Sequence, residues 1–169
     1  MPQAPDIVVR PVNTKQDKLA FLQVPFAVYR GDPHWVAPLF LERLEHLDPK
    51  KNPYFAHAEA QLFIAEQGGR PVGRISAQID RLRLERHRDA TGQFGFLEAP
   101  DDPAVFAALF KAAAHWLKKR GMKRVQGPFS FSINDETGGK LGLWRPGMAH
   151  FELALRTGSR HFSRGFCRA

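Results

Sequence analysis

Two short clusters of polar side chains contain groups that could move a proton or hold a polar substrate. They are Tyr29, Asp32, His34 and Trp35, and, further along, the run from Asn134 to Glu136. An unperturbed imidazole such as that of His34 titrates near pH 6.5, so it suits a general base, and Glu136 offers a carboxylate for the same role. Both clusters also have a structural interpretation. Asp32-Pro33 is typical of a turn with Trp35 packed beneath it, and residues 134–136 can be the polar end of a strand.

The rest of the sequence gives little support to metal, phosphate-loop or base-stacking chemistry. The seven histidines are scattered without ligand spacing, so no metal site is predicted. Gly68-Gly69 indicates a turn, because no Gly-Lys-Ser/Thr follows it. The four phenylalanines at every-other position of two strands could stack on bases if exposed, but we expect them in the core: Phe94, Phe96, Phe129 and Phe131.

Patterns of apolar residues predict the order strand, helix, helix, three strands, helix, strand. Strands are expected at residues 7–12, in the hairpin 61–80, at 93–99 and at 123–133. The first helix follows a capping-box-like pair, Thr14 and Asp17, and Pro25 is expected to kink or end it because proline lacks the amide donor. A second short helix is expected over residues 39–47. This order describes an α/β (α+β) domain with a largely antiparallel sheet.

Further expectations concern the longest helix, the hairpin 61–80 and the arginine-rich run that follows it. Asp102-Pro103 begins the clearest helix, since aspartate is a favoured N-cap and proline suits the first helical position, and Gly121 ends it. The hairpin 61–80 alternates apolar and polar residues, which predicts strands with one buried face. The arginine-rich run 81–89 carries Leu82 and Leu84 in alternation, so we interpret it as a solvated extension of the strand.

Five phrases of the sequence resemble a bacterial group of GNAT-like (N-acetyltransferase-like) proteins of unassigned substrate. The phrases are YRGDPHWVAPL (29–39), LDPKKNPYFAHAEAQLFIAE (47–66), GRPVGRISAQID (69–80), TGQFGFLEA (91–99) and RVQGPFSFSINDE (124–136). The resemblance covers residues 7–136, and it implies a GNAT-like acyltransferase-type domain over residues 1–136. Some members of the group carry a nucleotide-pyrophosphohydrolase label, but the G-x5-E-x7-R-E-x2-E-E run of those enzymes is absent here.

The resemblance also implies roles for particular residues. The loop between the first two helices would line the acceptor site with Tyr29, Asp32 and Trp35, and Asn134 would join them near the centre of the sheet. The strand at 93–99 would hold the acyl donor through Phe96, Leu97 and Glu98, with a backbone amide polarising the donor carbonyl. His34 or Glu136 would take the proton of an attacking amine.

The cofactor loop departs from the pattern of these acetyltransferases. They join the fourth strand to the long helix by a glycine-rich Q/R-x-x-G-x-G/A turn, whose amides hold the diphosphate of acetyl-CoA. The matching stretch here is EAPDDPA (98–104), which has no glycine, two prolines and three carboxylates. Its negative charge would repel a diphosphate. Acetyl-CoA or another acyl-CoA is therefore an expected donor on resemblance, but one that this loop does not favour.

The composition changes after residue 136. Residues 137–169 hold 6 of the 25 Lys+Arg and 1 of the 17 Asp+Glu, so much of the net charge of +8 belongs to this basic tail. One hypothesis is a reading frame that shifts near codon 137, which would leave the C-terminal strands of the fold missing. The alternative is a short variant with a basic interaction tail. Truncation would leave an open edge on the strand at 123–133, from which we expect self-association.

Three hypotheses of function follow. The first is a GNAT-type acyltransferase, or an inactive fragment of one. The second is a non-catalytic binding module on the same fold, and the third is a nucleic-acid binder acting through the basic tail. No signal peptide is recognised in the first residues, and no apolar run approaches the roughly 20 residues of a membrane span. We therefore expect a cytoplasmic protein without membrane or metal partners.

Overall fold

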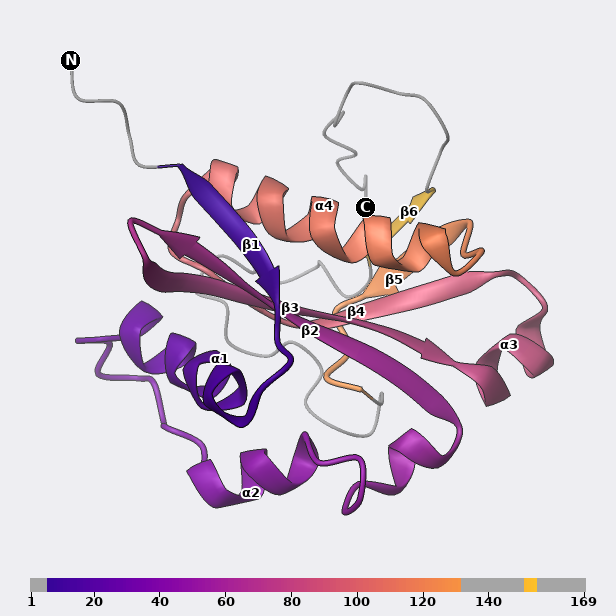
Figure 1. Cartoon of the computed structure of the whole chain (residues 1–169), viewed down its shortest axis with the longest axis horizontal. Coiled ribbons are helices and arrows are strands. Elements are labelled where there is room, and N and C mark those ends of the chain that lie inside the picture. Colours follow the sequence, from indigo (N-terminus) through magenta and orange to yellow (C-terminus); the bar gives the residue numbers. More distant parts are fainter. Residues whose placement is uncertain (1–5, 132–150, 155–169) are drawn as a thin grey trace.

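The computed structural model of the chain describes residues 6–131 and 151–154, which form one sheet with helices on both of its faces (Figure 1). The elements, in chain order, are β1 (Ile7–Pro11), α1 (Lys15–Val28), α2 (Phe40–His46), the 3₁₀ turn η1 (Pro53–Ala56), β2 (Ala58–Gln67), β3 (Arg70–Asp80), α3 (Arg81–His87), β4 (Thr91–Glu98), α4 (Pro103–Lys119), β5 (Arg124–Gly127) and β6 (Phe151–Ala154). The predicted order of elements is confirmed, with α3 and β6 added to it.

The strands lie in the order β1-β2-β3-β4-β5-β6. All neighbours are antiparallel except β4 and β5, which pair in parallel over Thr91–Gln93 and Arg124–Gln126. The parallel pair follows from the crossover through α4, because a parallel connection needs a long segment between its strands. The predicted mixed, mostly antiparallel sheet is therefore confirmed.

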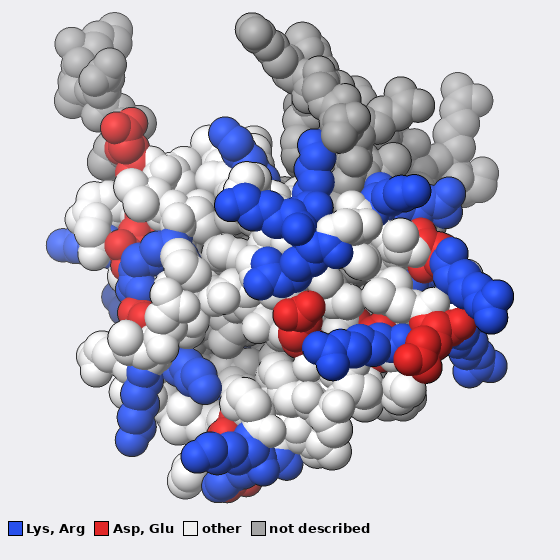
Figure 2. Space-filling model, turned by 45° about the vertical axis from the view of Figure 1, so that its right-hand side comes forward, with Lys and Arg blue, Asp and Glu red and all other residues white. Residues whose placement is uncertain are grey.

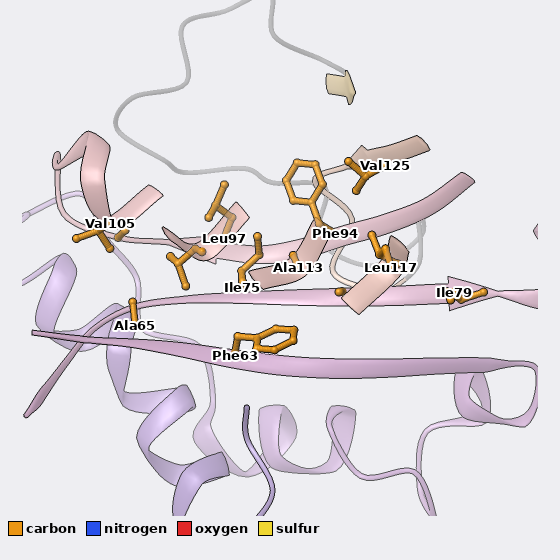
Figure 3. Packing of buried hydrophobic residues seen from close by; sticks show 13 residues of the cluster. Phe63, Ala65, Ile75, Ile79, Phe94, Leu97, Val105, Ala113, Leu117 and Val125 are labelled. Carbon is orange, nitrogen blue, oxygen red and sulfur yellow. The ribbon is translucent and has the colours of Figure 1, made fainter. Parts of the chain in front are cut away.

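One face of the sheet packs on α4 mainly through apolar side chains, and Arg120 at the end of the helix pairs with Glu59 of β2 at 3.5 Å. Ile75, Ala77, Leu109 and Leu117 are each at most 1% exposed in this cluster. Figure 3 shows how side chains from β2, β3, β4 and β5 meet those of α4, among them Phe63, Ile75, Phe94 and Val105. Burial of this kind is the main favourable contribution to folding.

The opposite face is covered by α1, α2 and η1, and its cluster is rich in aromatic rings. Phe21, Tyr54, Phe96 and Phe131 are buried there together with Ile64. The ring of Phe131 stacks on that of Tyr54, with centroids 5.2 Å apart and an interplanar angle of 16°. Both faces of the central strands are thus buried, and the expectation of a single buried face is wrong, since helices lie on both sides.

The predicted helix starts are confirmed, but helix α1 does not end at Pro25, and the alternative expectation of a kink stays a prediction. The Thr14 hydroxyl accepts from the Asp17 amide at 3.1 Å, and the Asp17 carboxylate accepts from the Thr14 amide at 2.9 Å. Asp102 caps α4 by accepting from the Ala104 amide at 2.9 Å. Helix α1 continues past Pro25 to Val28, because proline removes only one donor and its ring is buried against the sheet.

The run 81–89 is a helix and not a strand extension. The Asp80 carboxylate accepts from the Arg83 amide at 3.3 Å and so caps α3. Arg88 ends the helix in the left-handed region, with φ 51°. The guanidinium of Arg83 forms two bonds to the Asp89 carboxylate, of 2.9 and 3.0 Å, and holds the pKa of Asp89 down at about 2. Two leucines in alternation were too short a pattern to separate strand from helix.

The predicted strand at 123–133 is shorter than expected, and its edge is not open. β5 ends at Gly127, because the next residue, Pro128, has no amide donor to continue the ladder. Strand β6, which lies in the segment predicted as a basic tail, pairs with all four residues of β5. The open edge expected at residues 124–127 is therefore wrong, whereas self-association remains a prediction.

The charged side chains of residues 6–131 carry both signs. This part of the chain has 19 Lys+Arg and 14 Asp+Glu, and Figure 2 shows basic side chains spread over the face that it draws, with acidic ones among them. Arg10, for example, lies between Asp17 and Glu66, at 2.5 and 2.7 Å. Nucleic-acid binding through residues 137–169 stays a prediction, since only 151–154 of that segment are described.

Candidate functional site

A row of buried polar side chains lies on the α1–α2 face of β3. Arg74 is 8% exposed, and Ser76 and Gln78 are fully buried. The Ser76 hydroxyl donates to the Gln78 side-chain oxygen at 2.7 Å, and the Gln78 amide donates to the backbone oxygen of Phe129 at 2.6 Å. Buried polar groups need partners of this kind, since an unpaired one loses its hydration without compensation.

Arg74 is the centre of this row. Its guanidinium pairs with the Glu98 carboxylate on β4, with Nε and Nη2 at 2.6 and 2.5 Å from Oε2. A third bond goes from Nη1 to the backbone oxygen of Phe21, at 3.2 Å. That oxygen lies four residues before Pro25, which has no amide to offer it. The proline of α1 thus leaves a buried carbonyl for Arg74 to bind.

The aromatic rings of Phe21 and Phe96 complete the surroundings of Arg74. The guanidinium carbon is 4.8 Å from the centroid of Phe21 and 5.6 Å from that of Phe96. Burial lowers the pKa of Arg74 and the charge of Glu98 raises it. The guanidinium still stays charged at any ordinary pH, so the site contains a fixed cation paired with a carboxylate.

Strand β4 is interrupted by a bulge next to this pair. Ser76 of β3 is opposite Gly95 and Arg74 is opposite Glu98, so two residues of β4, Phe96 and Leu97, face one residue of β3. Phe96 has φ 47°, in the left-handed region. Phe94 and Phe96 consequently lie on opposite faces of the sheet, the first against α4 and the second against α1 and α2. A bulge of this kind takes a residue out of the ladder and re-aims its neighbours.

Tyr29, at the C-terminal end of α1, lies beside Glu98. Burial and the neighbouring Glu98 carboxylate, which accepts a hydrogen bond from the phenol, raise the pKa of Tyr29 to about 12. The phenol therefore stays protonated at neutral pH and can donate a hydrogen bond. Its ring stacks on Trp35, with centroids 5.4 Å apart. Tyr29, Trp35 and Glu98, which were predicted from separate segments, are thus brought to one place.

Two hydrogen bonds to Asp32 hold the loop after α1. The Asp32 carboxylate accepts from the backbone amide of His34 at 2.8 Å, and its backbone oxygen accepts from the Trp35 amide at 3.3 Å. The predicted turn at Asp32-Pro33 is confirmed. The side chain of His34 is on the exposed side of this loop. The other predicted catalytic and substrate-binding residues, Glu136 and Asn134, lie outside the described residues.

A small cavity of about 10 Å³ opens between α1, α2 and Arg74. Its walls are mostly apolar, and Arg74 and Arg43 add two cations: the lining residues are Leu22, Pro25, Phe26, Pro38, Phe40, Arg43 and Arg74. The volume is about that of a single water-sized group. The cavity therefore lies between Pro38, in the loop after α1, and Arg74.

The segment after β5 closes tightly on β4. The Phe129 amide donates to the Phe94 oxygen at 2.7 Å. A Cβ on Gly95 would lie 1.8 Å from the Phe129 oxygen, and one on Gly127 would lie 2.4 Å from the Phe94 oxygen. Only glycine allows backbones to approach this closely. The four predicted core phenylalanines are confirmed as buried, at 7% exposure or less.

The N-terminal end of α4 does not fit a diphosphate. Asp102 occupies the amide of Ala104, and Pro103 has no amide to give. Glu98 and Asp101 add negative charge on the same short loop. The free amides and the positive end of the helix dipole are what make a helix start an anion site. Here the Asp102 carboxylate takes the place of a bound anion at the start of α4, and this cap was predicted from the sequence.

Three residues near the site were missed from sequence. The expectation of one buried face for the hairpin 61–80 left Arg74 on the solvent side, and Gln78 was not considered. Both side chains are buried because helices cover both faces of the sheet. His46, at the end of α2, has its ring 5.9 Å from Phe96 and 5.2 Å from Phe131. No sequence signal pointed to it, because only the fold brings α2 to the bulge.

The described residues include no group of three or more His, Cys, Asp or Glu side chains arranged to hold a metal ion. Within the same part of the chain, none of the helices has the length and apolar character that crossing a membrane requires. The candidate site therefore consists of the β4 bulge at Phe96, the Arg74–Glu98 pair and the protonated phenol of Tyr29, all on the face that α1 and α2 cover.

Solved structures with the same architecture settle the fold. A tandem GNAT protein from the clavulanic acid biosynthesis pathway matches 72% of this chain and 36% of its own length, with a TM-score of 0.54 and 13% identity. A GNAT-family acetyltransferase from Desulfovibrio desulfuricans and an N-acetyltransferase from Staphylococcus aureus give TM-scores of 0.51 and 0.50 at 11% and 13% identity, each over 72% of both chains. The chain has the GNAT acetyltransferase fold.

Two curated relatives are much closer in sequence. The GNAT-fold chain is 50% identical over 140 residues to a protein of Caulobacter vibrioides named bacterial ceramide synthase, and 50% identical over 131 residues to protein YghO of Escherichia coli. These matches cover 82% and 78% of this chain but 36% and 33% of the relatives. The chain thus spans about a third of their length. No protein-family model matches the sequence.

Proposed function

We propose that this GNAT-fold chain belongs to an N-acyltransferase that forms an amide between an activated acyl group and a long-chain amine. The fold supports acyl transfer, and the 50% identity to the protein named ceramide synthase supports the amine class, since a ceramide is an N-acylated long-chain amino alcohol. The observation that carries the proposal is the bulge at Phe96, which turns a strand end out of its ladder beside Tyr29, Arg74 and Glu98.

In the proposed reaction the amine nitrogen attacks the carbonyl of an acyl thioester. A backbone amide at Phe96 or Leu97 donates to the carbonyl oxygen, which gains negative charge as the C–N bond forms. The C–S bond then breaks, and the sulfur leaves as a thiolate that takes up a proton. Because the start of α4 does not fit a diphosphate, the donor is placed by its acyl thioester end and no step depends on a nucleotide.

The polar residues have distinct roles in this proposal. Glu98, two residues after Phe96, attracts the ammonium form of the acceptor, and Arg74 fixes the direction of its carboxylate. Tyr29 stays protonated and orients the amine beside Glu98. His34 and Glu136 remain the proposed proton acceptors, to which the nitrogen loses its proton.

Amide formation is the direct test. The chain is incubated with a C18 amino alcohol and either a long-chain acyl-CoA or the same acyl group on N-acetylcysteamine, and the product is measured by mass spectrometry. We expect product with both donors, at least tenfold less product for Tyr29→Phe, and no change for Leu82→Ser, which alters an exposed residue of α3. The absence of product from both donors would contradict the proposal.

A second candidate is a binding module that kept the GNAT fold without a donor site. Two observations favour it: Asp102 occupies the amide at the start of α4, and Phe129 occupies the edge of β4 at Phe94. Calorimetric titration separates the two functions. If neither thioester produces heat of binding or raises the melting temperature of the chain, the result favours the binding module.

A further inference from the structure

Most of the exposed large apolar side chains of the described residues lie between the end of α1 and the start of α2. Of the six large hydrophobic residues that are exposed, four lie between residues 26 and 41: Phe26 at 38%, Val36 at 75%, Leu39 at 74% and Leu41 at 74%. The other two, Val8 and Leu82, lie on β1 and α3 and stand alone. Contiguous exposed apolar surface with a polar rim marks an interaction site.

We call residues 35–41, with the sequence WVAPLFL, the tip segment. It has no charged residue over seven positions, whereas charged or titratable residues flank it on both sides: Arg30, Asp32 and His34 before it, and Glu42 and Arg43 after it. The flanking charges include both signs, so the rim is close to neutral. An uncharged tip with a mixed rim complements the hydrocarbon and the zwitterionic headgroups of a neutral lipid bilayer.

The tip segment has an inner and an outer side. Trp35, Pro38 and Phe40 are partly buried, and Pro38 and Phe40 line the cavity that reaches Arg74. Val36, Leu39 and Leu41 point away from the protein. Edge-to-face contact of Trp35 with Phe26, at 5.1 Å, and the stacking on Tyr29 hold the segment on α1. The outer side chains are therefore presented on a supported backbone.

The apolar part of the patch is small. A stable protein interface buries about 800 Å² on each partner, and these four side chains expose roughly half of that, so a protein partner would also have to contact the charged rim. Insertion into a bilayer has no such threshold, because each apolar side chain that leaves water contributes independently. Trp35 at the base of the segment also suits the boundary between hydrocarbon and headgroups.

We propose that the tip segment inserts into the surface of a neutral phospholipid bilayer. The lipid acceptor of the proposed N-acyltransferase would enter from that bilayer, along Pro38 and Phe40, toward Tyr29 and Glu98. The entry route rests on the proposed function, but the insertion itself does not. Because the rim is close to neutral, binding is expected to change little with salt.

Flotation with phosphatidylcholine vesicles tests the insertion with the full 169-residue chain. We expect the chain to float with the vesicles at both 50 mM and 500 mM salt. The double variant Leu39→Ser/Leu41→Ser should bind about 100-fold more weakly, roughly tenfold for each leucine. The matched control is Leu82→Ser, which removes an exposed leucine from α3 and should float as the wild type does. All variants are first compared by thermal melting, which these exposed positions should leave unchanged.

A fluorophore at position 36 gives a second readout. An environment-sensitive dye on Val36→Cys, in a Cys167→Ser background, should shift to the blue with vesicles, whereas the same dye on Val8→Cys should not. Equal flotation of the double variant and the wild type would overturn the proposal. So would binding only to anionic vesicles that salt abolishes, which points to the basic tail, or a dimer that the leucine substitutions dissociate.

The experiments can refute the insertion proposal and the proposed function independently of each other. A chain that floats through the tip segment but forms no amide leaves the docking proposal standing and removes the proposed function. A chain that forms amide from detergent-dispersed amine but does not float does the reverse.

Discussion

The two faces of the sheet are both buried, yet they are built in different ways. Against α4, β3 presents Gly73, Ile75, Ala77 and Ile79 to a cluster of apolar side chains. Against α1 and α2 the same strand presents Arg74, Ser76 and Gln78, each with a dedicated partner. Apolar packing needs only shape and volume, whereas a buried polar row needs each of its bonds.

The two faces therefore differ in what their side chains can do: one supplies apolar packing, and the other carries polar groups that could contact a substrate. Among the described residues the α4 face is mainly apolar, and its Arg120–Glu59 pair lies at the end of the helix. The α1–α2 face collects a charged pair, a protonated phenol and a strand bulge, and Arg74 of the charged pair also lines a small cavity. Burying polar groups of this kind lowers the stability of the fold unless each finds a partner, so their concentration on the α1–α2 face makes that face the candidate site. Substitutions on each face test whether the apolar and the polar face contribute to stability in different ways.

The largest effect is expected for Arg74→Ala. It leaves the Glu98 carboxylate and the Phe21 oxygen without their partner, and removing one member of a buried ion pair costs about 3–5 kcal/mol. Chemical denaturation measures the change in the free energy of unfolding. Lys51→Ala is the control, because its pair with Glu45 is more than half exposed and is screened by solvent, so its loss should change stability little. Equal effects of the two substitutions would contradict the assignment of Arg74 as the centre of the polar face.

A somewhat smaller loss is expected for Leu109→Ala on the other face. Leu109 is fully buried against the sheet, and removing a buried leucine costs about 2–5 kcal/mol. Its signature should differ from that of Arg74→Ala: stability falls, but the alkaline titration of Tyr29 keeps its midpoint. A shift of that midpoint in Leu109→Ala would show that the two faces are coupled and not independent.

Gln78→Leu should cost about 1–3 kcal/mol, because the Phe129 oxygen and the Ser76 hydroxyl lose their buried partner. The volume is nearly kept, so the loss measures the hydrogen bonds and not a cavity. Gln16→Ala, on the exposed side of α1, should stay within about 0.5 kcal/mol. If Gln78→Leu is neutral in thermal and chemical unfolding, the polar row contributes nothing to the stability of this face.

The smallest effect is expected from the ionisation of Tyr29. Its pKa is raised to about 12 in the folded chain, above the ordinary value near 10, so the folded state holds this proton more tightly. The associated stability is fully present below pH 10 and is lost as the pH rises toward 12. The difference in absorbance at 295 nm between the wild type and Tyr29→Phe gives the midpoint directly. A midpoint near 10 would place the phenol in solvent and away from Glu98.

Local signals in the sequence predicted much of the fold. Thr14 with Asp17, Asp102 with Pro103, and Gly121 mark helix ends through contacts within a few residues, so they hold in any context. The phenylalanines on alternate positions of two strands were predicted to be core, and they are buried. The run 81–89 failed because its only local signal was two leucines, whereas the cap at Asp80 decided for a helix.

The candidate site was predictable only in pieces. Tyr29, Trp35 and Glu98 were proposed from two segments, and the fold places them together. Arg74 was not proposed, because its partners, the Phe21 oxygen and Glu98, lie 53 and 24 residues away in the chain. The sequence contains Pro25, but it cannot say which donor will take the carbonyl that the proline leaves free.

The sequence by itself determined the elements, their order, and the carboxylate that closes the start of α4 to a diphosphate. These are consequences of local backbone chemistry and short-range periodicity. The tertiary structure alone decided that both faces of the sheet are buried and that a bulge sends Phe94 and Phe96 to opposite sides. It also decided that the tip segment leaves three apolar side chains outside. Each of these depends on which distant segments share a boundary, and periodicity within one segment carries no information about that.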